Sequence, residues 1–168
     1  MRKRLHLLIS LILLTQCVYA SKNFTKAFNT IDSMLLGTKE YSFQEAVFST
    51  ERAYNDSLDK ELFNDRVNYL SSIVKGFSDA NKQNFKYTSE DKEEMLIHAS
   101  LFKLMTDSIL LLTVKNNYKI RHMPFMYNFE DPFGENWRKM FVSTLLDEHK
   151  GNCHSLPYLY KMIGAKLG

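Results

Sequence analysis

The chain has few of the residues that break helices or cross-link a fold. Its 168 residues include three Pro, six Gly and two Cys, and the first Pro is Pro124. One cysteine, Cys17, lies in an N-terminal stretch that we expect to be removed. A disulfide within the mature chain is therefore excluded, because only Cys153 remains. The scarcity of Pro and Gly before residue 124 favours a mainly α fold.

The chain also has little excess charge and no long apolar run. Arg2, Lys3 and Arg4 account for three of the 22 Lys and Arg, which leaves 19 against 19 Asp and Glu. Nucleic-acid binding is not expected, since it normally needs a clustered basic face. The apolar run from Leu5 to Leu14 is shorter than the about 20 residues that a spanning helix needs, so no stable membrane span is expected.

The first 20 residues have the three parts of a secretory signal. A basic start and an apolar run lead to the small-residue site Val18-Tyr19-Ala20. We therefore expect cleavage after Ala20 and export to the periplasm or the extracellular space. Lipid attachment at Cys17 is an alternative, but Gln16 occupies a position where lipoproteins usually have a small residue.

The rest of the chain has the content of one globular domain: 45% of residues are hydrophobic and 13% aromatic. Ser42 and Glu45 form a capping-box pattern at a helix start. The longest helix is expected to begin at Thr88, include the apolar residues through Leu112 and form the centre of the core. Apolar spacing and caps predict five to six helices in all, over residues 24–36, 42–54, a third from 56 or 59 that Gly76 and the polar run 78–84 end, 88–115, 136–150 and 155–168.

Residues 118–134 have a different character from the helical segments before them. Two prolines and the alternation Phe125, Tyr127, Phe129 predict a short strand or an extended loop. These aromatic residues either line a substrate cleft or belong to the core. In the next segment we expect Trp137, Met140, Phe141 and Leu145 to face inward.

The segment Gly151-Asn152-Cys153-His154-Ser155-Leu156-Pro157 is the most informative part of the sequence. It places a cysteine where a turn becomes a helix, and Pro157 is compatible with the first helical turn. A thiol there lies near unpaired backbone N–H groups and the positive end of the helix dipole. This position is typical of a nucleophile.

A helix terminus contributes only about 0.3–1 kcal/mol, which does not by itself make a strong nucleophile. A histidine or another cation must lie near the thiol. His154 is a poor candidate because its side chain points about 100° away on a helix. His149, His98 and His122 are further candidates, and the remaining possibility is a partner beyond Gly168.

The segment from Trp137 to Val142, the Gly151–Tyr160 segment and the Leu167-Gly168 ending together resemble the nucleophile helix of the transglutaminase-like (papain-related) superfamily. They are most similar to exported members from Bacteroidetes-like bacteria. The resemblance covers about thirty residues. It implies that Cys153 is the catalytic nucleophile and that its backbone N–H contributes to an oxyanion site.

The resemblance also implies that a histidine and an aspartate follow on strands of an antiparallel sheet, beyond Gly168. We therefore expect a signal peptide at 1–20, a helical region at 21–117, and at 118–168 the start of a truncated α+β transglutaminase-like domain. Asn152, His154 and Trp137 are candidate binding residues beside Cys153.

The predicted function is acyl transfer or amide hydrolysis through the Cys153 thiolate on a peptide or protein substrate, with the fragment itself inactive. The alternative is a non-catalytic helical binding or scaffold module of the cell envelope, with Cys153 as a small buried apolar residue. A metal site at His149, Cys153 and His154 is not expected, since the spacing matches no closed zinc pattern. No cofactor is implied.

Overall fold

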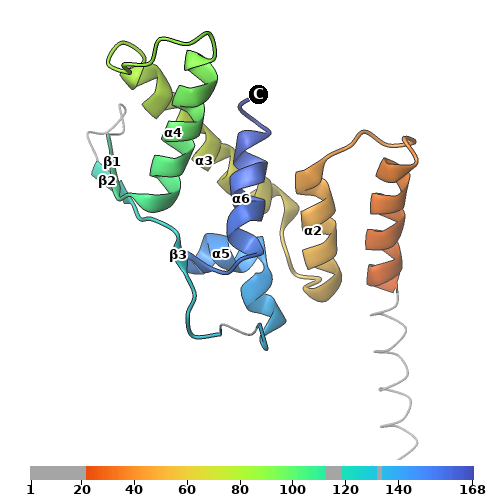
Figure 1. Cartoon of the computed structure of the whole chain (residues 1–168). Coiled ribbons are helices and arrows are strands. Elements are labelled where there is room, and N and C mark those ends of the chain that lie inside the picture. The colour runs from red at the N-terminus through yellow and green to blue at the C-terminus, as the bar shows by residue number, and fades with distance from the viewer. Residues whose placement is uncertain (1–21, 113–118, 132–133) are drawn as a thin grey trace, which may run out of the picture. The chain divides into compact units, whose positions relative to one another are not determined.

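A computed structural model describes residues 22–112, 119–131 and 134–168, apart from the side chain of Leu112 (Figure 1). The predicted export signal with Cys17 lies outside these residues, as does the expected helix end at 116–117. The chain divides into two compact units, one up to Lys60 and the other from Glu61 to Gly168. The two units are described separately.

The described part of the first unit contains two helices joined by a turn. The first helix covers residues 22–35 and stops before Gly37, whose φ of 70° suits glycine. The second, α2 (Phe43–Tyr54), is capped by Ser42, whose hydroxyl accepts a hydrogen bond from the Glu45 N–H. Both predicted helices are confirmed.

The apolar residues of the first helix are only partly buried. Ala27 and Met34 are buried, whereas Phe28 and Leu35 are 66% and 77% exposed. Phe24 contacts α2 from a half-exposed position, with its ring centroid 4.8 Å from that of Tyr54.

The second unit begins with the two longest described helices, α3 (Lys60–Asn81) and α4 (Lys92–Thr106). The helix passes through Gly76 and ends at Asn81, within the polar run 78–84 that is predicted, together with Gly76, to end it. A single glycine costs a helix only about 1 kcal/mol, which the buried residues around it outweigh. The prediction that α4 is the longest helix is wrong.

The apolar run Ile109–Leu112, predicted to lie at the end of the helix of residues 88–115, forms a strand instead. The helix ends at Thr106, and β1 (Ile109–Leu112) pairs antiparallel with β2 (Lys119–His122). Ile109 lies opposite His122 in this register. The short apolar run was compatible with both structures, and the pairing with β2 decided the outcome.

The C-terminal part of the second unit alternates short strands and helices. In chain order these are β3 (Met126–Tyr127), the 3₁₀ helix η1 (Trp137–Met140), α5 (Val142–Glu148), β4 (Lys150–Gly151) and α6 (Ser155–Gly164). The strands β3 and β4 pair in parallel. Arg66 of α3 forms an ion pair with Asp147 of α5.

The core of the second unit lies where α6 packs against α4 and α5. This packing buries the apolar face of α6, with Leu159, Met162 and Ile163. The largest fully buried side chains of the core come from these three helices: Leu101, Leu104, Leu145, Leu159, Met162 and Ile163.

The described chain is mainly α, as the sequence predicts. Among the described residues, no helix has both the length and the apolar character needed to cross a membrane.

Candidate functional site at Cys153

The turn that carries Cys153 is built from the end of α5 and the short strand β4. His149 ends α5 in the left-handed conformation, with φ 55° and ψ 18°. Gly151 then pairs with Tyr127 of β3, and its carbonyl accepts a hydrogen bond from the Asn128 N–H at 2.6 Å. The backbone is therefore fixed immediately before the cysteine.

Gly151 fits this position because no side chain has room there. A Cβ atom would lie 2.5 Å from Ser155 Oγ and 2.9 Å from Leu145 Cδ1. Real Cβ atoms essentially never approach other atoms within 3.0 Å. The glycine thus allows β4 to pack directly on α5 and on the start of α6.

Asn152 acts as the cap of α6. Its Oδ1 accepts hydrogen bonds from the N–H groups of His154 and Ser155, at 2.9 and 3.2 Å. The Ser155 hydroxyl oxygen accepts a hydrogen bond from the Asn152 N–H at 3.1 Å. This reciprocal pair is a capping box. The side chain of Asn152, a candidate binding residue, therefore caps the start of the helix with its Oδ1.

Cys153 lies between these two capping residues and is exposed. The helix that follows begins at Ser155, as predicted. In the described residues, neither the Cys153 thiol nor its backbone N–H forms a hydrogen bond. The turn immediately before α6 therefore presents a free thiol and a free N–H on the same residue.

His149 lies close in sequence to Cys153, but its ring is held elsewhere. Its Nδ1 donates a hydrogen bond to the Met123 carbonyl at 3.1 Å. The ring stacks on Phe125, with centroids 4.7 Å apart and planes 6° from parallel. His149 therefore belongs to a histidine–aromatic cluster with Phe125 and His122. Its ring forms no hydrogen bond to the thiol.

His122 belongs to the same cluster and is 7% exposed. Its Nε2 donates a hydrogen bond to the Leu104 carbonyl at 2.8 Å, and its ring lies 5.9 Å from that of His149. Burial lowers the pKa of His122, the hydrogen bond to Leu104 opposes this effect, and the nearby His149 adds to it. Local sequence patterns do not indicate this pair, because the two histidines come from distant segments.

The other candidate residues lie on the surface. His154 is exposed and contacts the edge of Tyr158, with ring centroids 5.5 Å apart. Trp137 opens η1 and is 62% exposed, so the prediction that it faces inward is wrong. The reason is local: α5 begins only at Val142, and η1 before it buries none of its residues.

His98 takes part in a separate group on α4. It lies 3.7 Å from Glu94 and 3.4 Å from the hydroxyl of Tyr160. No hydrogen bond joins it to Cys153. Among the described residues, none of the histidines considered from the sequence is bonded to the thiol.

The aromatic alternation near β3 divides between the core and the surface. Phe125 is buried, while Tyr127 and Phe129 are 37% and 79% exposed. Their two rings contact each other, with centroids 4.8 Å apart. The core interpretation therefore holds for Phe125 alone.

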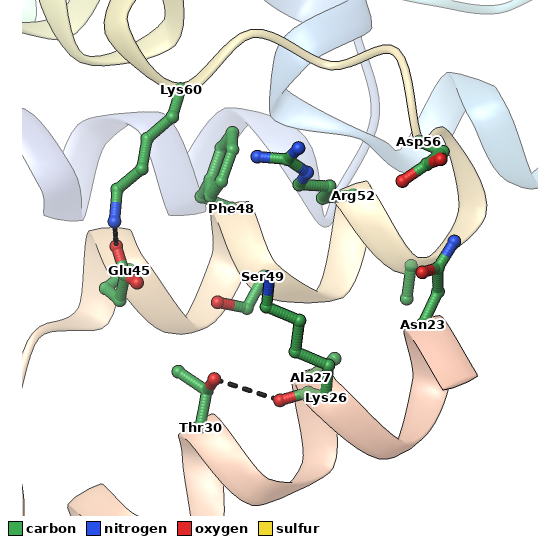
Figure 2. A pocket seen from close by; sticks show the side chains of 11 residues that line it. Asn23, Lys26, Ala27, Thr30, Glu45, Phe48, Ser49, Arg52, Asp56 and Lys60 are labelled. Atoms are coloured by element: carbon green, nitrogen blue, oxygen red, sulfur yellow. Dashed lines mark hydrogen bonds and ion pairs between the residues drawn. The ribbon is translucent and has the colours of Figure 1, made fainter. Parts of the chain in front are cut away.

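The first unit contains a hollow of about 200 Å³ between its two helices (Figure 2). Most of the side chains that line it are polar or charged, and Phe48 is among the apolar ones. Local sequence patterns do not indicate this hollow, since it depends on which faces of the two helices meet. Within the described ranges, no group of three or more His, Cys, Asp or Glu is placed to hold a metal ion.

No family model matches the chain, and comparison with the curated proteins and with the solved structures found no match.

Proposed function

We propose that this chain carries the nucleophile turn of an exported transglutaminase-like cysteine protein. Cys153 is the nucleophile, and the reaction is acyl transfer or amide hydrolysis on a peptide or protein substrate. The proposal combines the resemblance of the Trp137–Gly168 segment with the position of Cys153 in the fold.

The main support is the free backbone N–H of Cys153 beside its exposed thiol. Asn152 Oδ1 accepts from the N–H groups of His154 and Ser155. The Cys153 N–H is therefore the one that this cap leaves available at the start of α6. A donor next to the attacking sulfur can stabilise the negative oxygen of a tetrahedral intermediate.

In the proposed reaction, the Cys153 thiolate attacks the carbonyl carbon of an amide. A C–S bond forms, the C–N bond breaks, and the amine leaves with a proton from the general acid. Water or a second amine then attacks the thioester and releases the thiol. The resemblance places the histidine that transfers these protons, and the aspartate that orients it, on strands after Gly168.

The test is alkylation of Cys153 by iodoacetamide at pH 6 in the exported protein. If the thiol is activated, it should react about tenfold or more faster in the folded protein than in the same protein unfolded in urea. Equal rates would contradict the enzyme proposal. Mass spectrometry of the same sample locates the mature N-terminus, and a start at Ser21 would support export without lipidation.

The second candidate is a non-catalytic binding or scaffold module. It is favoured by the absence of any hydrogen bond to the Cys153 thiol within the described chain. The labelling experiment distinguishes the two functions. In a scaffold module the thiol is not activated, so Cys153 should react at the same rate in the folded and the unfolded protein.

A further inference from the structure

The hollow in the first unit lies between facing stripes of two helices. Residues 22–35 contribute Asn23, Lys26 and Thr30, which are spaced three and four apart and so share one helix face. The opposite wall comes from α2 and includes Phe48 and Arg52. Figure 2 shows Lys26 reaching across the hollow toward α2. Polar groups from both helices thus converge where a helix pair would ordinarily bury apolar side chains.

The acidic residue at one end of the hollow is already neutralised. Glu45 binds Lys60 at 2.6 Å and Lys39 at 3.4 Å. Burial alone would raise the pKa of Glu45, but the hydrogen bond and charge of Lys60, with the weaker contribution of Lys39, hold it below its usual value. This carboxylate is therefore ionised at neutral pH and occupied by two lysines.

The cations in the middle of the hollow have no such partner. In the described chain, neither Lys26 nor Arg52 forms an ion pair, and Asp56 at the far end is also unpaired. The Arg52 guanidinium lies 5.9 Å from the centre of the Phe48 ring, which is buried. This contact orients the planar guanidinium and leaves its N–H donors unused.

A second, more open hollow continues over the helix of residues 22–35. It shares Lys26 and Thr30 with the first and adds Lys22, Asn29 and Ser33. Among the described residues that line it, none is acidic. Lys22 and Lys26 are one helical turn apart, where like charges repel and an anion between them would be stabilised.

We propose that these two hollows form one binding groove for an oxyanion carried by a hydroxyl-bearing molecule, such as an acidic sugar. Arg52 and Lys26 bind the carboxylate or phosphate group. Guanidinium and ammonium groups form charge-assisted hydrogen bonds with such anions. The side chains of Asn23, Asn29 and Ser33 supply donors and acceptors for the hydroxyl groups. This groove is independent of Cys153 and of the proposed reaction.

The test is a titration of the purified full chain with glucose 6-phosphate, followed by ¹H–¹⁵N NMR. Saturable shifts are expected for the backbone amides of residues 22–35 and 45–56. Glucuronate in place of glucose 6-phosphate distinguishes a carboxylate from a phosphate, and inorganic phosphate tests the contribution of the sugar. Uncharged glucose should bind much more weakly than either acidic sugar.

Two variants give the decisive comparison. Arg52→Gln should raise the Kd about tenfold, since it removes a charge-assisted interaction. Lys75→Gln, which removes an exposed cation on α3, should change the Kd by less than about twofold. Lys26→Gln provides a second groove variant if Arg52→Gln folds poorly. The proposal would be overturned if Arg52→Gln and Lys75→Gln bound the acidic sugar with the same Kd. It would also be overturned if glucose bound as tightly as glucose 6-phosphate, or if no saturable shifts appeared.

Discussion

Asn152 and Ser155 each accept a hydrogen bond from the other's backbone N–H, at 3.2 and 3.1 Å. Both residues are buried, with 6% and 0% of their surface exposed. The exposed Cys153 lies between them. The start of α6 is therefore fixed by two polar side chains, neither of which forms a hydrogen bond to the thiol.

This relationship predicts the effect of Asn152→Ala. The variant removes the acceptor for two N–H groups at the start of α6, and its free energy of unfolding should fall by about 1 kcal/mol. Urea denaturation followed by circular dichroism measures the change. Asn152→Ser keeps a capping oxygen and should lose less than half as much. An unchanged stability in Asn152→Ala would show that the cap contributes nothing.

Gly151→Ala should destabilise the protein for a different reason. The added Cβ would lie 2.5 Å from Ser155 Oγ and 2.9 Å from Leu145 Cδ1, and relieving these contacts costs about 1–3 kcal/mol. Gly76→Ala is the matched control, because no atom lies within 4 Å of the new Cβ in the interior of α3. That control should stabilise the protein by about 0.5–1 kcal/mol. Similar changes in the two variants would contradict the packing of Gly151.

Features that depend on neighbours in sequence could be predicted. The helix that begins at Ser42 was located correctly, since the capping serine and the apolar spacing both lie within it. Even here the prediction was incomplete. The Glu45 carboxylate was expected to return to the backbone of Ser42, but it binds Lys39 and Lys60. Lys60 comes from a later segment, which local patterns do not include.

Features that depend on distant segments could not be predicted. The run Ile109–Leu112 is apolar on all sides and fits a buried helix or a strand equally well. Its pairing with Lys119–His122 makes it a strand. No residue in the run indicates that partner.

The candidate site likewise has one part that depends on sequence neighbours and another that depends on distant segments. The turn before Cys153 and the helix after it follow from Gly151, Asn152 and Pro157, which are local. The approach of His122 to His149 requires β2 and the end of α5 to meet, so it was missed.

The buried His122 should make stability depend on pH. Because its folded-state pKa lies below the ordinary value of 6.5, the unfolded chain takes up a proton before the folded protein does. This contribution to stability is complete above about pH 6.5 and is lost as the pH falls toward the lower folded-state value. The slope for one proton is at most about 1.4 kcal/mol per pH unit. Urea denaturation between pH 7.5 and 5 measures it.

His122→Gln removes the titrating group and keeps an N–H donor for the Leu104 carbonyl. The variant should therefore show a smaller loss of stability on acidification than the parent protein. Four other histidines remain in the chain, and His149 is the one whose ring faces His122. His98→Gln, on the exposed face of α4, is the control and should keep the parent's pH dependence. A parent-like slope in His122→Gln would show that another group is responsible.

Trp137→Ala and Leu145→Ala should separate the surface of the C-terminal segment from its core. Trp137 is 62% exposed, so its removal should change the free energy of unfolding by less than about 0.5 kcal/mol. Leu145 is fully buried beside Gly151, and its truncation leaves a cavity that costs about 2–5 kcal/mol. Thermal and urea denaturation measure both. A large loss in Trp137→Ala would mean that this side chain packs against the protein after all, as its sequence position first suggested.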